Sequence, residues 1–519
     1  MTESIAMNVP VETKYIWFPV AKGAGRQKVC IYPLREPENR LFEFDLPVAF
    51  DHFDFYAALP VEEFLGRTLT ISVNFPFDGP GSLVCSDELP PPETCTRPIL
   101  HFTAEKGWIN DPNGLIYDDG TWHMYYQYNP YDTKWGNMHW GHAISRDLTH
   151  WTECGVVLKP DGNGTVFSGS ALKDIRNVAG HGWNAYLYFY TAAGGTNLWS
   201  EDRKFTQFMA VSTDRGMTLQ TMPACSVDTI TRENRDPKVF YHEQSGAYIM
   251  VLFLDNNDFA ILRSMDLSAW TMTQRLTLPD AWECPDLFEL PVEGTGRTAW
   301  VFWSADGYYF TGSFDGFRFI PDGPHRNAYI GSIPYAAQTF SGVTGRTVSV
   351  PWLRISPPDK PYAGIMGIPS ELSLIPSDKH PRIRYALARE FTAQRVNLFE
   401  TVLSSAGVYR LPDPGKGPFE AVLNFPAIRG KRAIFGFGSH ILDIDFDAGT
   451  LSLDDNMITR ITDSALDIDL IVDYDVIELR ACHDTIYCVS PNTDPEPGGI
   501  TGMKLLSDSR CEVRYYTFS

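Results

Sequence analysis

The sequence lacks the features that mark several common classes of protein. Its first seven residues hold neither a basic segment nor a long apolar one, so we expect no signal peptide and a cytoplasmic location. No apolar run approaches the roughly 18 residues of a membrane span, and we expect no membrane partner. Lys and Arg number 43 against 64 Asp and Glu, a net charge of −21, which argues against a nucleic acid partner.

Motifs of metal, redox and nucleotide chemistry are also missing. The nine cysteines are scattered and form no CxxC pair, which is typical of free thiols in a reducing compartment. There is no G-x-S-x-G elbow and no phosphate-binding P-loop. His139 and His142 lie three residues apart without a third ligand nearby, so we expect no metal and no cofactor. The composition does not exclude that the protein forms a homo-oligomer.

What the sequence has in abundance is aromatic and turn-forming residues. Aromatic residues make up 13% of the chain, and Gly and Pro number 41 and 37. This combination is typical of an all-β protein with short strands. Proline-rich stretches at 88–95 and 356–381 interrupt the pattern, because proline cannot continue a helix or a central strand. We therefore expect an N-terminal β-rich module (1–95), a central domain (96–375) and a C-terminal β-sandwich (376–519).

The central region carries a degenerate repeat, apolar-x-Ser-x-Asp or close to it. Its copies end at Asp147, Asp214, Asp266 and Asp315, which are 67, 52 and 49 residues apart. A period near 50 in β-rich sequence indicates one four-stranded sheet per unit, and hence a β-propeller. Four loose copies also arise by chance in β-rich sequence, so that alternative stays open.

Three acidic residues lie in turn-like segments that would meet at the mouth of a propeller channel. Asp111 follows a Trp-Ile-Asn segment, so its carboxylate is expected beside bulky apolar groups. Asp236 follows Arg235, and a neighbouring guanidinium favours the ionised carboxylate. Glu283 is flanked by a Trp and a Cys, and apolar surroundings raise a carboxyl pKa, which suits a general acid. The alternative for each is an ordinary turn or ion-pair role.

Taken together, the three carboxyl groups match the needs of glycosidic bond cleavage. One carboxyl group protonates the leaving oxygen, and a second attacks the sugar or activates water. A third can hold a sugar hydroxyl. The set therefore predicts a glycosidase more strongly than any of its members does alone.

The segments around these acids resemble glycoside hydrolase family 32, the invertase, levanase and exo-inulinase group. Residues 108–114 are similar to its W-[MI]-N-D-P-N-G block, 235–237 to its R-D-P block and 283–285 to its E-C-P block. The order and the separation of the three blocks also agree. Further similar segments are 126–130, 135–142, 167–170, 335–340 and 367–372.

The resemblance implies a fold and a set of roles. The fold would be a five-bladed β-propeller followed by a β-sandwich. Asp111 would be the nucleophile, Glu283 the general acid and base, and Asp236 a ligand of fructose hydroxyls that stabilises the transition state. The substrate-binding residues would be Trp108, Asn110, Gln127, Trp135, Phe167, Ser168 and Arg235. No metal is implied.

The expected function is that of a retaining β-fructofuranosidase. Such an enzyme releases fructose from the non-reducing end of sucrose and β-fructo-oligosaccharides or fructans by double displacement. The alternatives are a fructosyltransferase on the same site, a non-catalytic fructan-binding protein and a five-bladed arabinan-type hydrolase. The family usually starts near its first block, whereas about 95 residues precede it here. That segment would bind carbohydrate, support an oligomer, narrow the active-site mouth or only pack.

Overall fold

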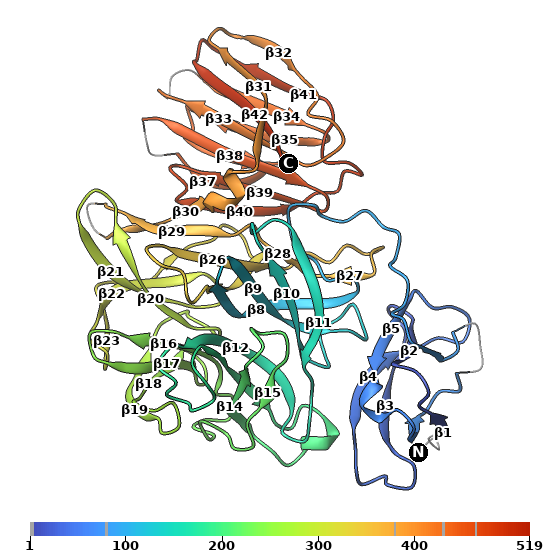
Figure 1. Cartoon of the computed structure of the whole chain (residues 1–519). Helices are drawn as coiled ribbons and strands as arrows, with labels where there is room; N and C mark the ends of the chain where they lie inside the picture. Colours follow the sequence, from blue (N-terminus) through green and yellow to red (C-terminus); the bar gives the residue numbers. More distant parts are fainter. Residues whose placement is uncertain (1–4, 78–80, 378–379, 428–430, 462–463, 519) are drawn as a thin grey trace.

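The chain is built almost entirely from β strands (Figure 1). The computed structural model describes residues 5–77, 81–377, 380–427, 431–461 and 464–518. In these ranges the helical segments are η1 (Glu62–Phe64), η2 (Leu198–Ser200) and α1 (Arg389–Thr392). None of the helices described is long and apolar enough to span a lipid bilayer. The all-β class predicted from the composition is confirmed.

Two small antiparallel sheets at the start of the chain share a core of their own. Their strands are β1 (Ile5–Pro10), β2 (Tyr15–Val20), β3 (Arg26–Pro33), β4 (Phe42–Pro47), β5 (Phe55–Pro60), β6 (Thr68–Val73) and β7 (Val84–Ser86). One sheet has the order β1-β6-β3-β4 and the other β5-β2-β7. Alternate residues such as Val29 and Ile31 point inward, as strand geometry requires, and pack with Phe18 and Phe44. We call residues 5–77 and 81–86 the N-terminal module.

Three sheets of four or five strands follow the module. The first contains β8 (Gly107–Asp118), β9 (Thr121–Asn129), β10 (His139–Ser145), β11 (Trp151–Leu158) and β27 (Tyr362–Ala363). The second contains β12 (Thr165–Asp174), β13 (Ala185–Ala193), β14 (Phe205–Ser212) and β15 (Gln220–Thr221). The third contains β16 (Arg235–His242), β17 (Ala247–Phe253), β18 (Asp258–Ser264) and β19 (Thr271–Thr277). The consecutive strands β8–β11, β12–β15 and β16–β19 each form a meander, whereas β27 joins the first sheet from a distant segment.

A ten-stranded sheet completes the central region. Its strands are β20 (Asp286–Val292), β21 (Arg297–Trp303), β22 (Tyr308–Phe314), β23 (Phe319–Pro321), β24 (Arg326–Asn327), β25 (Pro334–Thr339), β26 (Thr347–Leu353), β28 (Ile365–Met366), β29 (Ser370–Ile375) and β30 (Arg382–Leu387). One parallel contact between β20 and β29 joins its two halves. The short strand β27 pairs in parallel with β8, which brings the end of the region back to its first sheet.

The first strands of successive sheets lie next to one another. The backbone N–H of Gly169 in β12 donates to Asn113 of β8 at 3.1 Å, and Ser170 of β12 donates to the Pro237 carbonyl of β16 at 2.8 Å. The buried ammonium of Lys238 in β16 then contacts Asp286 of β20 at 3.0 Å. These contacts bring the first strands of four consecutive sheets together at the centre of the region.

The four copies of the Ser-x-Asp repeat lie at the ends of the third strands β10, β14, β18 and β22. The first and third copies form the same turn. In the first copy Ser145 Oγ accepts from the Leu148 N–H at 2.8 Å, and Leu148 has a positive φ of 64°. Leu267 repeats both features in the third copy. Side chains that accept from the backbone stabilise such turns, which explains why the pattern recurs once per sheet.

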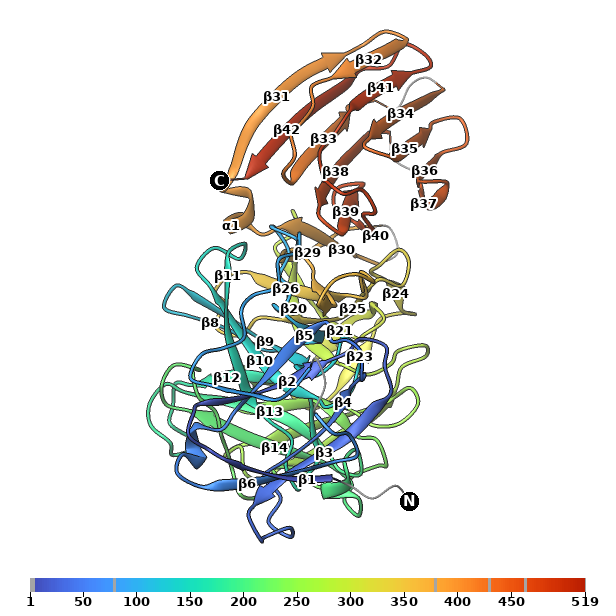
Figure 2. The ribbon, with the colours of Figure 1, turned by 90° about the vertical axis from the view of Figure 1, so that its right-hand side faces the viewer.

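Two six-stranded sheets at the end of the chain pack face to face (Figure 2). One contains β31 (Arg395–Leu403), β42 (Cys511–Phe518), β33 (Phe419–Phe425), β38 (Leu466–Asp473), β39 (Val476–Ala481) and β40 (Ile486–Pro491). The other contains β32 (Gly407–Leu411), β41 (Thr501–Leu505), β34 (Arg432–Phe437), β35 (His440–Asp445), β36 (Thr450–Leu453) and β37 (Asn456–Arg460). Their inward side chains, among them Phe435, Leu423 and Ile468, form one buried core.

A buried histidine ties this sandwich to the central sheets. His101, just before β8, contacts Asp473 at 2.9 Å and Glu478 at 3.2 Å, and all three side chains are fully buried. Burial alone would lower the pKa of His101, but the hydrogen bonds to the two carboxylates outweigh it and raise the pKa to about 9. Burial also opposes the charge on Glu478, yet Arg480 and His101 lower the pKa of Glu478 to about 2.

These shifts predict how stability depends on pH. His101 has a raised pKa, so its contribution is fully present below pH 6.5 and is lost as the pH rises to about 9. Glu478 has a lowered pKa, so its contribution is present above pH 4.5 and is lost as the pH falls towards 2. We expect His101→Gln to lose about 3 kcal/mol at pH 6 and to flatten the decline of Tm between pH 6.5 and 9. An equal decline in wild type and variant would contradict this, and the exposed His52→Gln is the control.

Candidate active site

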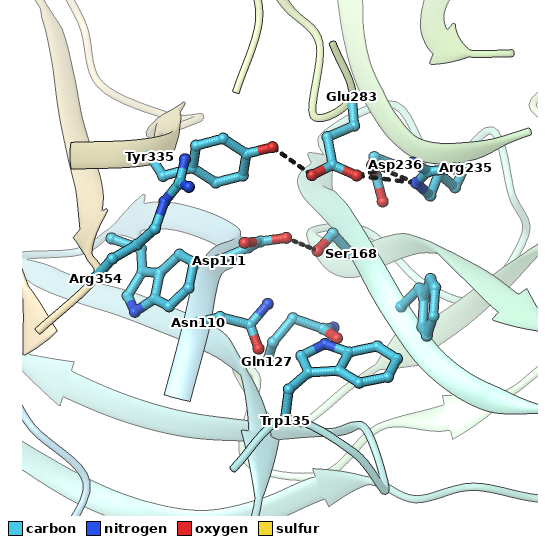
Figure 3. Close-up of a pocket in the computed structure, with 12 residues that line it drawn as sticks. Asn110, Asp111, Gln127, Trp135, Ser168, Arg235, Asp236, Glu283, Tyr335 and Arg354 are labelled. Carbon is cyan, nitrogen blue, oxygen red and sulfur yellow. Dashed lines mark hydrogen bonds and ion pairs between the residues drawn. The ribbon is translucent and has the colours of Figure 1, made fainter. Parts of the chain in front are cut away.

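A cavity of about 320 Å³ opens at the centre of the sheets (Figure 3). Nine of the ten predicted site residues line it, the exception being Trp108. Three further residues complete the wall. The lining residues are Asn110, Asp111, Gln127, Trp135, Phe167, Ser168, Arg235, Asp236, Glu283, Tyr335, Trp352 and Arg354.

β-Bulges place the key side chains in this cavity. The strand register shifts at residues 110–111 in β8, 167–168 in β12, 236–237 in β16 and 336–337 in β25. At each shift two residues oppose a single residue of the partner strand, and a bulge of this kind re-aims side chains. Asp236 also has a φ of 63°, in the left-handed region that non-glycine residues seldom occupy. The first strands of three sheets, β8, β12 and β16, thus deliver Asp111, Ser168 and Asp236 to the same cavity.

Asp111 lies at the floor of the cavity. Its Oδ2 accepts a hydrogen bond from Ser168 Oγ at 2.6 Å and lies 3.4 Å from Cys284 Sγ. Burial and the nearby charge of Glu283 raise the pKa of Asp111, while the hydrogen bonds from Ser168 and Asn110 oppose the rise. The carboxylate is therefore held in one orientation with one oxygen engaged.

Asp236 is buried beside Asp111. Its Oδ2 accepts from the backbone N–H of Cys284 at 3.1 Å and lies 3.6 Å from Arg235 Nε. The sequence predicts that Arg235 keeps this carboxylate ionised. Instead, burial together with the charges of Glu283 and Asp111 outweighs Arg235 and raises the pKa of Asp236 to about 7. Arg235 therefore favours the ionised form less than predicted, because its guanidinium is shared with Glu283 and Asp236 is buried.

Glu283 lies on the loop between β19 and β20 and faces the other two acids. Its Oε2 accepts from Arg235 Nη2 at 2.8 Å, and its Oε1 accepts from the Tyr335 hydroxyl at 2.5 Å. The sequence predicts an apolar surround from the flanking Trp and Cys. The structure places a guanidinium and a phenol there instead, and the Trp282 ring packs against Phe253.

Cys284 stands between the two aspartates. Its thiol lies 3.4 Å from Asp111 Oδ2 and 3.5 Å from Asp236 Oδ2. Burial and the three surrounding carboxylates raise the pKa of Cys284 well above its usual value, so the thiol stays protonated and donates. The group therefore does not serve as a thiolate nucleophile.

Aromatic rings form the side wall of the cavity. Trp135 is 51% exposed and packs edge-on against Phe167, with ring centroids 5.9 Å apart. Gln127, whose Nε2 donates to the Val166 carbonyl at 2.9 Å, lies beside them. Rings and fixed polar groups in a small cavity are the usual components of a site for a polar ligand with apolar faces.

Trp108 stands behind the wall rather than on it. Its Nε1 donates to Asn110 Oδ1 at 2.9 Å, and its ring packs edge-on against Trp352 at 5.6 Å. The structure thus gives Trp108 the role of orienting Asn110. Its expected direct contact with a substrate stays a prediction.

Three lining residues were not among the predicted site residues. Tyr335 lies in a segment already noted for its resemblance, but Trp352 and Arg354 on and just after β26 belong to no recognised motif. Arg354 stacks on the Tyr335 ring at 3.6 Å, and Tyr335 in turn contacts Glu283. In the described part of the chain, no group of three or more His, Cys, Asp and Glu side chains could hold a metal ion.

Comparisons with known proteins agree with this geometry. The family model described as the glycosyl hydrolases family 32 N-terminal domain matches residues 101–384, more than half of the chain. An extracellular exo-inulinase of Meyerozyma guilliermondii is 36% identical over 318 residues, which cover 56% of this chain and 61% of that protein. A levanase of Bacillus subtilis is 32% identical over 377 residues, or 66% and 54% of the two chains. The matched segments thus span less than two thirds of these curated relatives.

Solved structures match over a longer part of the chain. The crystal structure of an exo-inulinase from Aspergillus awamori has a TM-score of 0.73 at 23% identity and covers 82% of this chain and 98% of that one. A β-fructofuranosidase of Schwanniomyces occidentalis complexed with fructosyl-erythritol has a TM-score of 0.70 at 24% identity, covering 80% and 97%. At these identities the likeness supports the fold alone.

Proposed function

The chain belongs to glycosyl hydrolase family 32, and from this premise we propose that it is a retaining β-fructofuranosidase. The observation that carries the proposal is the meeting of Asp111, Asp236 and Glu283 in one cavity. The exo-inulinase and levanase relatives support fructosides as the substrate class. The cavity volume of about 320 Å³ is close to the lower limit for ligand-binding sites. A volume this small favours removal of a terminal sugar over cleavage within a polymer.

The contacts suggest a separate role for each of the three acids. Asp111 attacks the anomeric carbon of fructose, Glu283 protonates the glycosidic oxygen, and the carbon–oxygen bond breaks to leave a fructosyl ester on Asp111. Glu283 then takes a proton from water, and the resulting hydroxide oxygen attacks the same carbon and frees Asp111. Asp236 accepts hydrogen bonds from fructose hydroxyls. Two displacements retain the configuration of the anomeric carbon.

The charges in the cavity bear on this mechanism. Burial and the neighbouring carboxylates raise the pKa of Asp111 and of Asp236. The proposed reaction requires a protonated Glu283 and an ionised Asp111. Ser168, which donates to Asp111, favours the ionised form of the nucleophile.

We also propose a division of the fold. Residues 96–375 would be a five-bladed propeller, in which the pairing of β20 with β29 fuses the last two blades. Residues 1–95 would form the N-terminal unit that contains the module, and residues 376–519 the C-terminal unit that contains the sandwich, with β30 extending the central sheet through β29. The repeated turn and the convergence of the first strands support this arrangement.

Product analysis with sucrose, 1-kestose, inulin and levan tests the proposed function. We expect free fructose from sucrose and kestose, and its loss in Glu283→Ala. Kestose-type oligomers as the main product at high sucrose concentration would instead indicate a fructosyltransferase. If none of the four substrates yields fructose or a transfer product, the proposal is wrong.

A further inference from the structure

The loop between β9 and β10 carries Trp135 to the rim of the cavity. We call residues 130–138 the Trp135 loop. On its inner side the central sheets hold it through Asn129, which donates from Nδ2 to the Lys134 carbonyl at 2.8 Å and accepts from Asn137 Nδ2 at 3.1 Å. On its outer side it contacts the N-terminal module, which lies to the side of the central sheets (Figure 1).

The start of the loop is inserted into the module. The ring of Tyr131 belongs to the hydrophobic core of the module and stacks on Phe44, with centroids 3.9 Å apart and planes at 9°. The next residue, Asp132, is 1% exposed and forms an ion pair with Arg26 of β3 at 2.6 Å. A buried carboxylate depends on such a partner, because an unpaired charge in the interior is costly.

The same arginine reaches the functional residue itself. Arg26 Nη2 donates to the backbone carbonyl of Trp135 at 3.1 Å. Gly136 favours this close contact between Arg26 and the loop. A Cβ at position 136 would lie 3.1 Å from Arg26 Nη1, and the φ of Gly136 is 147°, which residues other than glycine rarely adopt. The guanidinium therefore fixes the two ends of the segment 132–135 at once.

The end of the loop is held by backbone contacts. Asn137 Oδ1 accepts from the Asp45 N–H at 2.7 Å, and Asn137 Nδ2 donates to the Asp45 carbonyl at 2.8 Å. A side-chain amide that pairs with both the N–H and the C=O of one residue in β4 sets the position of the loop along the strand. Residues 131, 132, 135 and 137 are thus all held by the module.

We propose that the N-terminal module is a positioning element of the active site, which uses Arg26 and Asp45 to hold Trp135 at the cavity rim. Trp135 is 51% exposed, and Arg26 of the module binds its backbone carbonyl directly. The module contributes no residue to the cavity wall and acts through the loop. The effect on turnover rests on the proposed function, whereas the effect on the loop does not.

Two matched variants separate positioning from general stability. Arg26→Ala removes the contacts to Asp132 and Trp135. Lys22→Ala removes another contact between module and central region, in which the ammonium donates to the carbonyls of Pro358 and Lys360 at 2.9 and 2.8 Å, away from the loop. We expect hydrogen exchange of the loop amides in the full chain to accelerate at least about tenfold in Arg26→Ala and to stay unchanged in Lys22→Ala.

Kinetics on sucrose gives the second readout. Arg26→Ala should lower kcat/KM about tenfold, mainly through KM, because a displaced Trp135 weakens binding without touching the carboxylates. In a double-mutant cycle, Arg26→Ala should cost little once Trp135 is already alanine. Asn137→Ala serves as the second variant if Arg26→Ala does not fold.

The outcomes are distinct. Faster loop exchange with no fructose release by wild type would refute the proposed function and leave the positioning role standing. Unchanged exchange in Arg26→Ala, or additive effects in the double mutant, would overturn the positioning role while leaving the proposed function untouched. Equal effects of Arg26→Ala and Lys22→Ala would also overturn it, because they would indicate stability alone.

Discussion

Replacement of Asp111 by alanine is expected to lower kcat for fructose release from sucrose by about 10⁴-fold or more. The proposed covalent ester cannot form without this carboxylate, which Ser168 orients at 2.6 Å. Because the attack occurs only in the transition state, kcat and kcat/KM should fall together. Initial rates on sucrose, with thermal melting to verify the fold, measure the effect.

Asp119→Ala is the matched control for Asp111. Asp119 follows the far end of β8, and its side chain is 76% exposed, so its loss should leave the rate unchanged. The same mechanism predicts that NMR detects the β-anomer of fructose first. Release of the α-anomer, or retention of a tenth of the activity by Asp111→Ala, would refute the nucleophile role.

The three acids could be predicted from the sequence because each lies in a short, unusual segment. The segments pointed to the three acids as candidate site residues, and the order of the segments along the chain indicated that the acids belong to one site. The sequence does not show how they meet, because the bulges at 110–111, 167–168 and 236–237 arise from mismatched pairing between strands. The Ser-x-Asp repeat could be recognised in the sequence for a different reason, because its side chains stabilise a turn within the same short segment.

The features that escaped prediction depend on long-range contacts. Trp352 and Arg354 enter the cavity wall from β26 and the residue that follows it, more than 200 residues from Asp111, and nothing in their local sequence marks them. The raised pKa of Asp236 depends on burial and on two distant acids, which the adjacent Arg235 does not reveal. The contact of Arg26 with the Trp135 loop likewise joins residues more than 100 positions apart.

Glu283→Gln is expected to lower kcat on sucrose by about 10²- to 10⁴-fold, the usual contribution of a general acid–base group. The amide keeps the shape of the side chain and one acceptor oxygen, which can serve either the Tyr335 hydroxyl or Arg235. It cannot donate an acidic proton to the leaving oxygen. Initial rates on sucrose, with thermal melting to verify the fold, measure the effect.

Substrates with different leaving groups distinguish acid–base catalysis by Glu283 from mere binding of fructose. Fluoride departs from a fructosyl fluoride without needing a proton, and azide attacks the ester without needing a base. With both present, Glu283→Gln should recover to within about tenfold of wild type, whereas on sucrose it should stay impaired. The control Glu289→Gln alters an exposed carboxylate on β20 and should behave as wild type on both substrates. Equal impairment of Glu283→Gln on both substrates would mean that Glu283 binds fructose and does not transfer the proton.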